Sequence, residues 1–196
     1  HPITSMHAGM AYLPEDRKNE GIIADLSVRE NMIMALQAKR GMFHLLSRKQ
    51  QEEFTDKYIE MLQIKTASRE TPIKSLSGGN QQKVGLDPDM KKTVGKYSLG
   101  MRQRLGIAQA IMENPRFLIL DEPTRGIDVG TKTEIQKLVV KLASQGMAVV
   151  FISSEIEEML RTCDRMVVMR DGAKVGELSG NEMNQSSIMS TIAGGQ

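Results

Sequence analysis

A short apolar run that ends in two adjacent carboxylates constrains the fold of this chain more than any other feature. Residues 116–130 read RFLILDEPTRGIDVG, in which Asp121 and Glu122 follow the apolar residues and Pro123 breaks the pattern. A strand buried on both faces has this composition, with polar groups only at its carboxyl end. Because ligands of open α/β sheets bind beyond the carboxyl ends of the strands, we expect Asp121 and Glu122 to line a binding site.

Hydrophobic residues followed by Asp-Glu are typical of the Walker B motif of nucleotide hydrolases. In such a site Asp121 holds Mg²⁺ through an oxygen ligand and Glu122 polarises the attacking water. The dipeptide alone fits equally well a strand whose solvated end merely carries two acids, because short motifs also match by chance. The rest of the chain has to decide between these interpretations.

Composition excludes several classes of protein. The 196 residues suit one domain, and 40% hydrophobic with 26% charged residues is the balance of a soluble globular protein. A formal charge of +2, no Trp and 4% aromatic residues give no support to nucleic-acid binding. The single Cys163 predicts a reducing compartment, and no apolar run approaches the roughly 18 residues of a membrane span. Since the chain starts with His1 and not Met, we expect it to be a piece of a longer protein.

The other elements follow from local patterns. Residues 9–13 predict a short strand that Pro14 ends. Two capping boxes, Ser27 with Glu30 and Ser47 with Gln50, predict the starts of two amphipathic helices. After residue 130 the pattern predicts a helix over 131–144, a strand over 147–152 that ends in Ser153-Ser154, and a short helix from 155. A strand over 165–170, a turn at Asp171-Gly172, a strand over 174–178 and a weak helix over 188–193 complete the chain.

One motif occurs twice. Residues 76–84 read LSGGNQQKV, and residues 97–105 read YSLGMRQRL, with Ser98 and Gly100 in the places of Ser77 and Gly79. Small residues at a helix N-terminus leave backbone N–H groups open to an anion, and the helix dipole favours its binding. We therefore expect a phosphate site at one copy, although a flexible glycine pair beside an ordinary N-cap would give the same pattern.

Taken in order, these motifs resemble the ATP-binding-cassette (ABC) family of transport ATPases. LSGGNQQK is similar to the signature motif, FLILDEPT to Walker B, and residues 125–128, RGID, to the D-loop. PEDRK near the N-terminus and TRGIDVG resemble the second nucleotide-binding domain of monosaccharide importers of the ribose, galactose and xylose type. The resemblance covers nearly all of residues 1–84 and 116–193.

The resemblance implies an α/β fold with a RecA-like P-loop NTPase core of ABC type and a helical subdomain. Residues 1–26 and 116–196 would form the core, and 27–115 the helical subdomain with its duplicated signature. The implied catalytic residues are Glu122 and Ser154, the latter at the switch-histidine position, and the implied Mg²⁺ ligand is Asp121. The residues implied to contact ATP are Glu15, at the position of the Q-loop glutamine, and Ser77, Gly78, Gly79, Gln81, Ser98, Gly100 and Asp128.

The chain departs from the family in two ways. No G-x-x-x-x-G-K-[ST] occurs in it, so we expect it to lack the P-loop strand and its phosphate cradle. Ser98 precedes Asp121 by 23 residues, which is similar to the spacing between signature motif and Walker B in the family, whereas Ser77 precedes Asp121 by 44 residues. We therefore expect the weaker copy to hold the signature position. Residues 85–115 resemble the drug- and peptide-exporter ATPases, so the sequence is interpreted as a hybrid.

The function implied by the resemblance is that of an ATP-hydrolysing subunit of a sugar importer, present as a C-terminal fragment. Its implied partners are a second ABC ATPase domain that supplies a P-loop, transmembrane permease subunits and, indirectly, a periplasmic or extracellular sugar-binding protein. The implied location is cytoplasmic, on the inner face of the cell membrane. The alternative is a non-catalytic ABC-like interaction module, or hybrid fragment, that cannot bind ATP alone.

Overall fold

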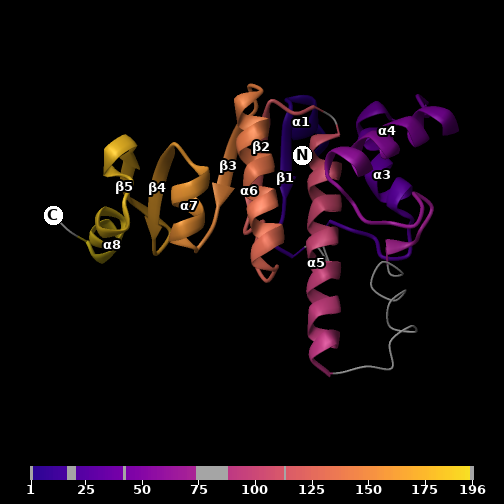
Figure 1. The fold of residues 1–196 in the computed structure, drawn as a ribbon. Helices are drawn as coiled ribbons and strands as arrows, with labels where there is room; N and C mark the ends of the chain where they lie inside the picture. The colour runs from indigo at the N-terminus through magenta and orange to yellow at the C-terminus, as the bar shows by residue number, and fades with distance from the viewer. Residues whose placement is uncertain (1, 17–20, 42, 74–87, 113, 195–196) are drawn as a thin grey trace.

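The computed structural model describes residues 2–16, 21–41, 43–73, 88–112 and 114–194 (Figure 1). Within them the helices are α1 (Pro2–His7), α3 (Val28–Arg40), α4 (Arg48–Met61), α5 (Pro88–Ile111), α6 (Val129–Ser144), α7 (Ile156–Thr162) and α8 (Gln185–Ala193). The strands are β1 (Met10–Leu13), β2 (Phe117–Asp121), β3 (Ala148–Ile152), β4 (Arg165–Arg170) and β5 (Ala173–Ser179), and a 3₁₀ turn covers Gly180–Glu182. The strands predicted over 9–13, 116–121 and 147–152 are thus confirmed to within one residue.

Three parallel strands position the site. They lie in the order β1-β2-β3, with Leu13 beside Leu120 and Leu120 beside Phe151. Parallel strands end at the same edge of a sheet, so the segments after β1, β2 and β3 meet there. The sheet confirms the predicted α/β class and brings the carboxylates after β2 next to the serines after β3.

One face of this sheet is covered by helices and carries the main core. Leu118 and Leu120 of β2 are fully buried in one cluster with Leu105 of α5 and Ile135 and Val139 of α6, and α6 lies across β2 and β3 in Figure 1. The buried side chains of β2, Leu118 and Leu120, are two positions apart, because successive side chains of a strand point to opposite faces of the sheet.

The opposite face of the sheet is only partly covered within the described residues. Tyr12, Val150 and Ile152 alternate with the buried side chains and are 55%, 40% and 45% exposed. Parallel sheets are ordinarily covered on both faces. This face therefore carries apolar surface that other elements of such folds would bury.

The helical segment follows the predicted capping. The hydroxyl of Ser27 accepts a hydrogen bond from the Glu30 N–H at 3.2 Å, and the Glu30 carboxylate accepts one from the Ser27 N–H at 2.8 Å. Ser47 and Gln50 form the same reciprocal pair at the start of α4. Both predicted helix starts are confirmed, because these hydrogen bonds involve only residues three positions apart.

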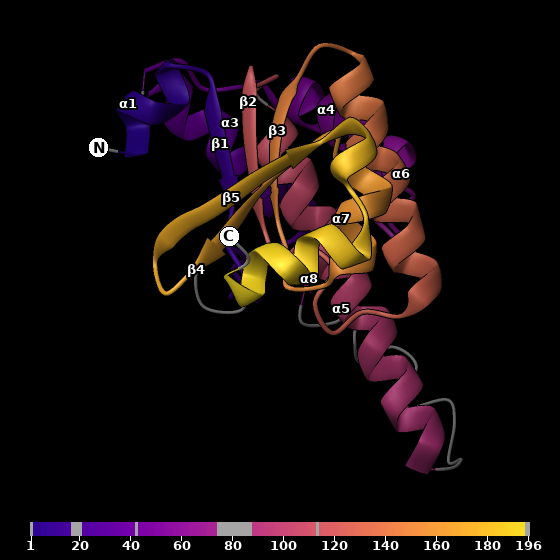
Figure 2. The same ribbon diagram turned by 90° about the vertical axis from the view of Figure 1, so that its left-hand side faces the viewer.

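A hairpin and a helix form the C-terminal part. β4 and β5 pair antiparallel through the predicted turn, in which Asp171 and Gly172 both have positive φ. Ile188 of α8 packs with Met166 and Val168 of β4 in a second, smaller core. Figure 2 shows α8 lying beside this hairpin. The predicted hairpin is therefore confirmed.

Two helices differ from expectation. No helix was expected over Pro2–His7, where α1 occurs. The expectation that Ser98 lies at a helix N-terminus is wrong, because α5 begins at Pro88 and includes Ser98 well inside it. Pro88 suits the first turn of a helix, and the residues after it are compatible with helix, so the pattern continues without a stop. The first copy of the motif, over 76–84, lies outside the described residues.

Candidate functional site

The carboxylates after β2 lie where three segments meet. Asp121 ends β2, and its Oδ2 accepts a hydrogen bond from the Tyr12 hydroxyl at 3.0 Å. The Glu122 Oε1 accepts one from the Ser154 backbone N–H at 2.9 Å, and the Glu122 N–H donates to the Ile152 carbonyl at 2.9 Å. The structure thus brings together Asp121, Glu122 and Ser154.

The backbone of Glu122 has an unusual conformation. Its φ is +43°, in the left-handed region that residues with a Cβ adopt infrequently. Such conformations persist where surrounding contacts hold them, and they cluster at functional sites. Here the two hydrogen bonds between Glu122 and the end of β3 hold the turn.

Asp121 offers the type of ligand that Mg²⁺ requires. It is a half-buried carboxylate at a strand end, and among the described residues no group of three or more His, Cys, Asp or Glu side chains could hold a metal by itself. Mg²⁺ commonly takes only one or two protein carboxylates and completes its shell with water and substrate phosphates. The residues present therefore fit Mg²⁺ held together with a phosphate, and do not form a separate protein cage.

Asp128 caps helix α6. Its Oδ1 accepts from the Thr131 N–H at 2.9 Å and its Oδ2 from the Thr131 hydroxyl at 2.8 Å. These bonds, the backbone one first, hold the pKa of the Asp128 carboxyl below its ordinary value. In this structure the Asp128 carboxylate caps the N-terminus of α6.

Glu15 follows β1 and forms an ion pair with Arg125, just after the Asp121-Glu122 turn. Both side chains are largely exposed, so solvent screens the pair and it contributes little to stability. The pair nevertheless places Glu15 at the same sheet edge as the carboxylates of β2.

The second motif copy packs inside the chain. A Cβ on Gly100 would lie 2.9 Å from the Thr131 Cγ2, and a Cβ on Gly126 would lie 3.2 Å from the Leu99 side chain. Gly100 is buried. α5 thus uses Leu99 and Gly100 to contact the start of α6 and the turn after β2. Of the other expected signature residues, Ser77, Gly78, Gly79 and Gln81 lie outside the described part of the chain.

Sequence reasoning missed a cluster beside the carboxylates. The buried Glu158 of α7 accepts hydrogen bonds from the Thr124 and Ser153 hydroxyls, and Lys132 of α6 pairs with it. No local pattern separates Glu158 from its exposed neighbour Glu157, because both lie in one run of acidic residues. Tyr12 was also missed, as its partner Asp121 is 109 residues away.

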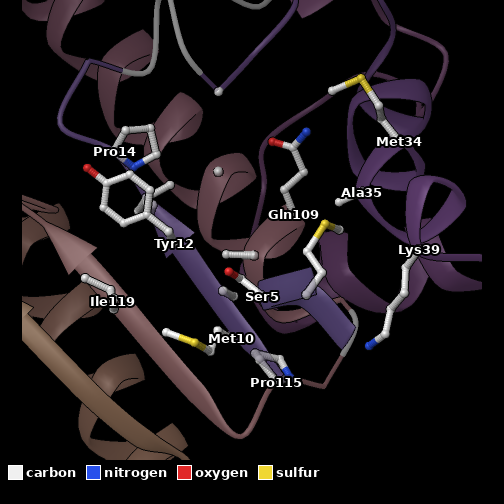
Figure 3. A pocket seen from close by; sticks show the side chains of 16 residues that line it. Ser5, Met10, Tyr12, Pro14, Met34, Ala35, Lys39, Gln109, Pro115 and Ile119 are labelled. Carbon is white, nitrogen blue, oxygen red and sulfur yellow. The ribbon is translucent and has the colours of Figure 1, made fainter. Parts of the chain in front are cut away.

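A pocket of about 710 Å³ lies beside the site, between β1, α3 and α5. Tyr12 and Pro14 stand at one end of it, and Met10 and Pro115 at the other (Figure 3). Its lining is mostly apolar, with Lys39 and Gln109 among the polar exceptions. Since the hydroxyl of Tyr12 reaches Asp121, this residue forms the boundary between the pocket and the carboxylates.

The ABC transporter family profile matches residues 86–125, which contain the second motif copy and both carboxylates. The chain is 44% identical over 193 residues to the fructose import ATP-binding protein FruK of Bifidobacterium longum, covering 98% of this chain and 34% of that protein. It is 45% identical over 185 residues to the galactofuranose transporter ATP-binding protein YtfR of Escherichia coli K12, covering 94% and 33%.

Two further comparisons agree with these. The ribose import ATP-binding protein RbsA of Bacillus cereus is 39% identical over 195 residues, covering 100% of this chain and 35% of that protein. The solved structure of the ATP-binding cassette MJ0796 aligns with a TM-score of 0.65 at 20% identity, covering 90% of this chain and 65% of that one, and so shows the same fold. The chain spans about a third of the length of the curated relatives.

Among the described residues, no helix is both long and apolar enough to cross a membrane. The matches to sugar-import proteins extend over nearly the whole chain, on either side of the carboxylates, and the fold is that of an ATP-binding cassette. The chain therefore belongs to the ATP-binding domains of ABC transporters and is homologous to the ATP-binding proteins of bacterial sugar importers.

Proposed function

We propose that this chain is the C-terminal part of an ATP-hydrolysing subunit that drives sugar import, and that it carries the hydrolytic carboxylates. The observation that supports this most directly is the Glu122 carboxylate at the end of a buried parallel strand, held by the Ser154 N–H at 2.9 Å. The homologues are sugar-import proteins, and fructose, galactofuranose and ribose are named for them.

In this proposal Glu122 acts as the base that orients and polarises the attacking water. A carboxylate fixed by a backbone N–H on one oxygen keeps its second oxygen in a defined direction, which is the preorganisation that such a step needs. Asp121 would hold Mg²⁺, which when bound neutralises charge that develops on the phosphate oxygens. The Tyr12 hydroxyl orients Asp121 through its 3.0 Å hydrogen bond.

The remaining parts of the ATP site would come from outside these 196 residues. The sequence contains no G-x-x-x-x-G-K-[ST], so the N–H groups and lysine that cradle phosphates have to be supplied by another segment or by a second ABC ATPase domain. Ser77, Gly78, Gly79, Gln81, Ser98 and Gly100 remain candidates for the signature contact. The neighbouring solved structure is described as a dimer bound to ADP and phosphate, which is the kind of assembly proposed here.

The subunit would act on the inner face of the cell membrane, in contact with transmembrane permease subunits. A sugar-binding protein would deliver the sugar to those permease subunits. This part of the proposal rests on the importer names of the relatives.

The test is the substitution Glu122→Gln in a complete assembly with an intact P-loop. Glutamine keeps the size and an oxygen that can accept from Ser154, but it loses the charge that polarises water. We expect turnover of ATP to fall by about 10²-fold or more while ATP binding is retained. Glu157→Gln, an exposed carboxylate on α7, is the matched control. Near-normal turnover of Glu122→Gln would remove this residue from the proposed role.

A second candidate is a non-catalytic interaction module. It is favoured by the absence of a P-loop motif from the sequence and by Gly100, which is buried against Thr131 and so faces its own chain. In that case the wild-type assembly would show no more ATP turnover than its partner subunit alone, and Glu122→Gln would change nothing.

A further inference from the structure

Glu158 is a buried carboxylate with partners from three segments. Only 3% of its surface is exposed, whereas Glu157 beside it is exposed. Its Oε2 accepts hydrogen bonds from the Thr124 hydroxyl and from the Ser153 hydroxyl, the latter at 3.1 Å. The Lys132 Nζ lies 3.0 Å from its Oε1. A buried carboxylate needs a charge partner and hydrogen bonds; here Oε2 accepts both hydrogen bonds, and the Lys132 ion pair faces Oε1.

These partners flank the contact between Glu122 and Ser154. Thr124 lies in the turn just after Glu122, and Ser153 directly precedes Ser154. The Ser153 hydroxyl also accepts a hydrogen bond from the Glu155 N–H at 3.0 Å, which shapes the loop after β3. Glu158 therefore links the turn after β2 to the loop after β3, through residues within two positions of the 2.9 Å hydrogen bond from Ser154 to Glu122.

We propose that Glu158 is a positioning residue for hydrolysis. Through Thr124 and Ser153 it holds the loop after β3 against the turn after β2, so that the Ser154 N–H stays directed at the Glu122 carboxylate. Lys132 balances the charge of Glu158 from α6. The expected effect on turnover rests on the proposed function. The structural half of the inference, that Glu158 holds the loop after β3 in place, rests on the contacts alone.

Substitution of Glu158 should release this tie. In Glu158→Ala the hydroxyls of the buried Thr124 and the half-buried Ser153 lose their acceptor, while the Lys132 ammonium keeps its other partner, Glu155. A polar group left without its partner in a buried place is costly. The loop after β3 then opens more often, because the hydrogen bond from Ser154 to Glu122 is exposed and relies on its surroundings for geometry.

The first experiment measures amide hydrogen exchange of Ser154 by NMR in the 196-residue chain. Glu122→Ala, which removes the acceptor, gives the reference rate for an unbonded Ser154 amide. We expect Glu158→Ala to raise the exchange rate of this amide toward that reference, by about tenfold, which corresponds to one lost hydrogen bond. Glu157→Ala should leave the rate at the wild-type value. A Ser154 rate in Glu158→Ala within about twofold of wild type overturns the proposal.

A matched pair at Thr124 covers the case in which Glu158→Ala does not fold, as judged by circular dichroism. Thr124→Val keeps the shape and removes the hydroxyl that donates to Glu158, whereas Thr124→Ser keeps the hydroxyl. The proposal expects faster Ser154 exchange in Thr124→Val and wild-type exchange in Thr124→Ser. Equal rates in the two variants count against it.

The second experiment measures ATP turnover of a complete assembly that carries Glu158→Ala or the Thr124 pair. A positioning role predicts a kcat lower by about tenfold with KM for ATP within about twofold, and recovery in Thr124→Ser. If wild-type turnover is itself absent, the proposed function fails while the exchange data still decide the structural half. If the exchange rates change as expected but kcat does not, Glu158 shapes the loop without positioning the reaction.

Discussion

At the residue scale, the ionised Asp128 carboxylate makes the stability of the α6 N-terminus depend on pH. Its folded-state pKa lies below the ordinary value of about 3.9 because of the hydrogen bonds from Thr131, so the ionised cap stabilises the fold above that value. The contribution is lost as the pH falls through the lower, folded-state pKa. Above about pH 5 it is fully present.

We expect Asp128→Ala to lower the free energy of unfolding by about 1 kcal/mol at pH 7, because the α6 N-terminus loses its acceptor. Thermal or urea unfolding between pH 7 and pH 3 measures this, and the difference from wild type should shrink below pH 4 or so. Asp128→Asn keeps a capping oxygen and is the control. An unchanged difference across the whole pH range would show that the charge of Asp128 plays no part.

Gly100 shows how closely α5 approaches α6. A Cβ at this position would lie 2.9 Å from the Thr131 Cγ2, although alanine favours the helix more than glycine does. We expect Gly100→Ala to lose about 1 kcal/mol of stability in urea unfolding, because overpacking exceeds the gain in helix propensity. Thr131→Ser removes the obstructing methyl and keeps the hydroxyl that donates to Asp128, so the double variant should recover the loss. Stabilisation by Gly100→Ala alone would mean that the contact is loose.

At the element scale, α3 is defined by its capping box. Its side chains Met32, Ile33 and Leu36 are buried in the main core. The first N–H groups of a helix have no intrahelical partner. In α3 the Ser27 hydroxyl accepts a hydrogen bond from one of them, the Glu30 N–H, at 3.2 Å. The box therefore determines where the helix begins.

Ser27→Ala should reduce the free energy of unfolding by about 1 kcal/mol, since the Glu30 N–H loses its acceptor, the hydroxyl of the buried Ser27. Denaturant unfolding followed by circular dichroism measures the change. Ser190→Ala, at an exposed position of α8, is the control and should change stability by less than about 0.5 kcal/mol. Equal effects of the two substitutions would argue against the cap.

The helix that carries the second motif copy leads directly to the carboxylates. α5 runs without interruption from Pro88 through Ser98 to Ile111, and β2 follows at Phe117. This agrees with the spacing argument for Ser98, but the interior position of Ser98 removes the helix N-terminus that the phosphate argument requires. Use of either copy as a signature motif remains a prediction.

At the scale of the whole molecule, the chain contains both carboxylates of the site but no P-loop motif that would bind phosphate. Phosphate binding in such folds relies mainly on the N–H groups and lysine of the P-loop, for which this chain has no motif. The isolated chain should therefore bind Mg-ATP weakly or not at all.

Isothermal titration calorimetry of the monomeric chain with Mg-ATP tests this. We expect no saturable heat up to millimolar nucleotide, and the same result for Glu122→Gln as a matched control, since hydrolysis then cannot mask binding. Micromolar affinity of the lone chain would contradict the prediction and would require a phosphate site elsewhere in these residues.

Much of this protein is determined locally, and so the sequence by itself predicts it. The three parallel strands, the two capping boxes and the Asp171-Gly172 turn depend on hydrophobic periodicity and on hydrogen bonds between residues a few positions apart. The expectation that Asp121 and Glu122 end a buried strand is confirmed for the same reason. Local patterns carry this information because each depends on a short window of the chain.

Only the tertiary structure decided which side chains meet at that strand end. Tyr12 reaches Asp121 across 109 positions, Ser154 reaches Glu122 across 32, and Thr124 reaches Glu158 across 34. Whether Glu158 or Glu157 is buried depends on how α7 packs, and the interior place of Ser98 depends on where α5 begins. Such contacts are set by the order of strands and the packing of helices over the whole domain, which no short window of the sequence contains.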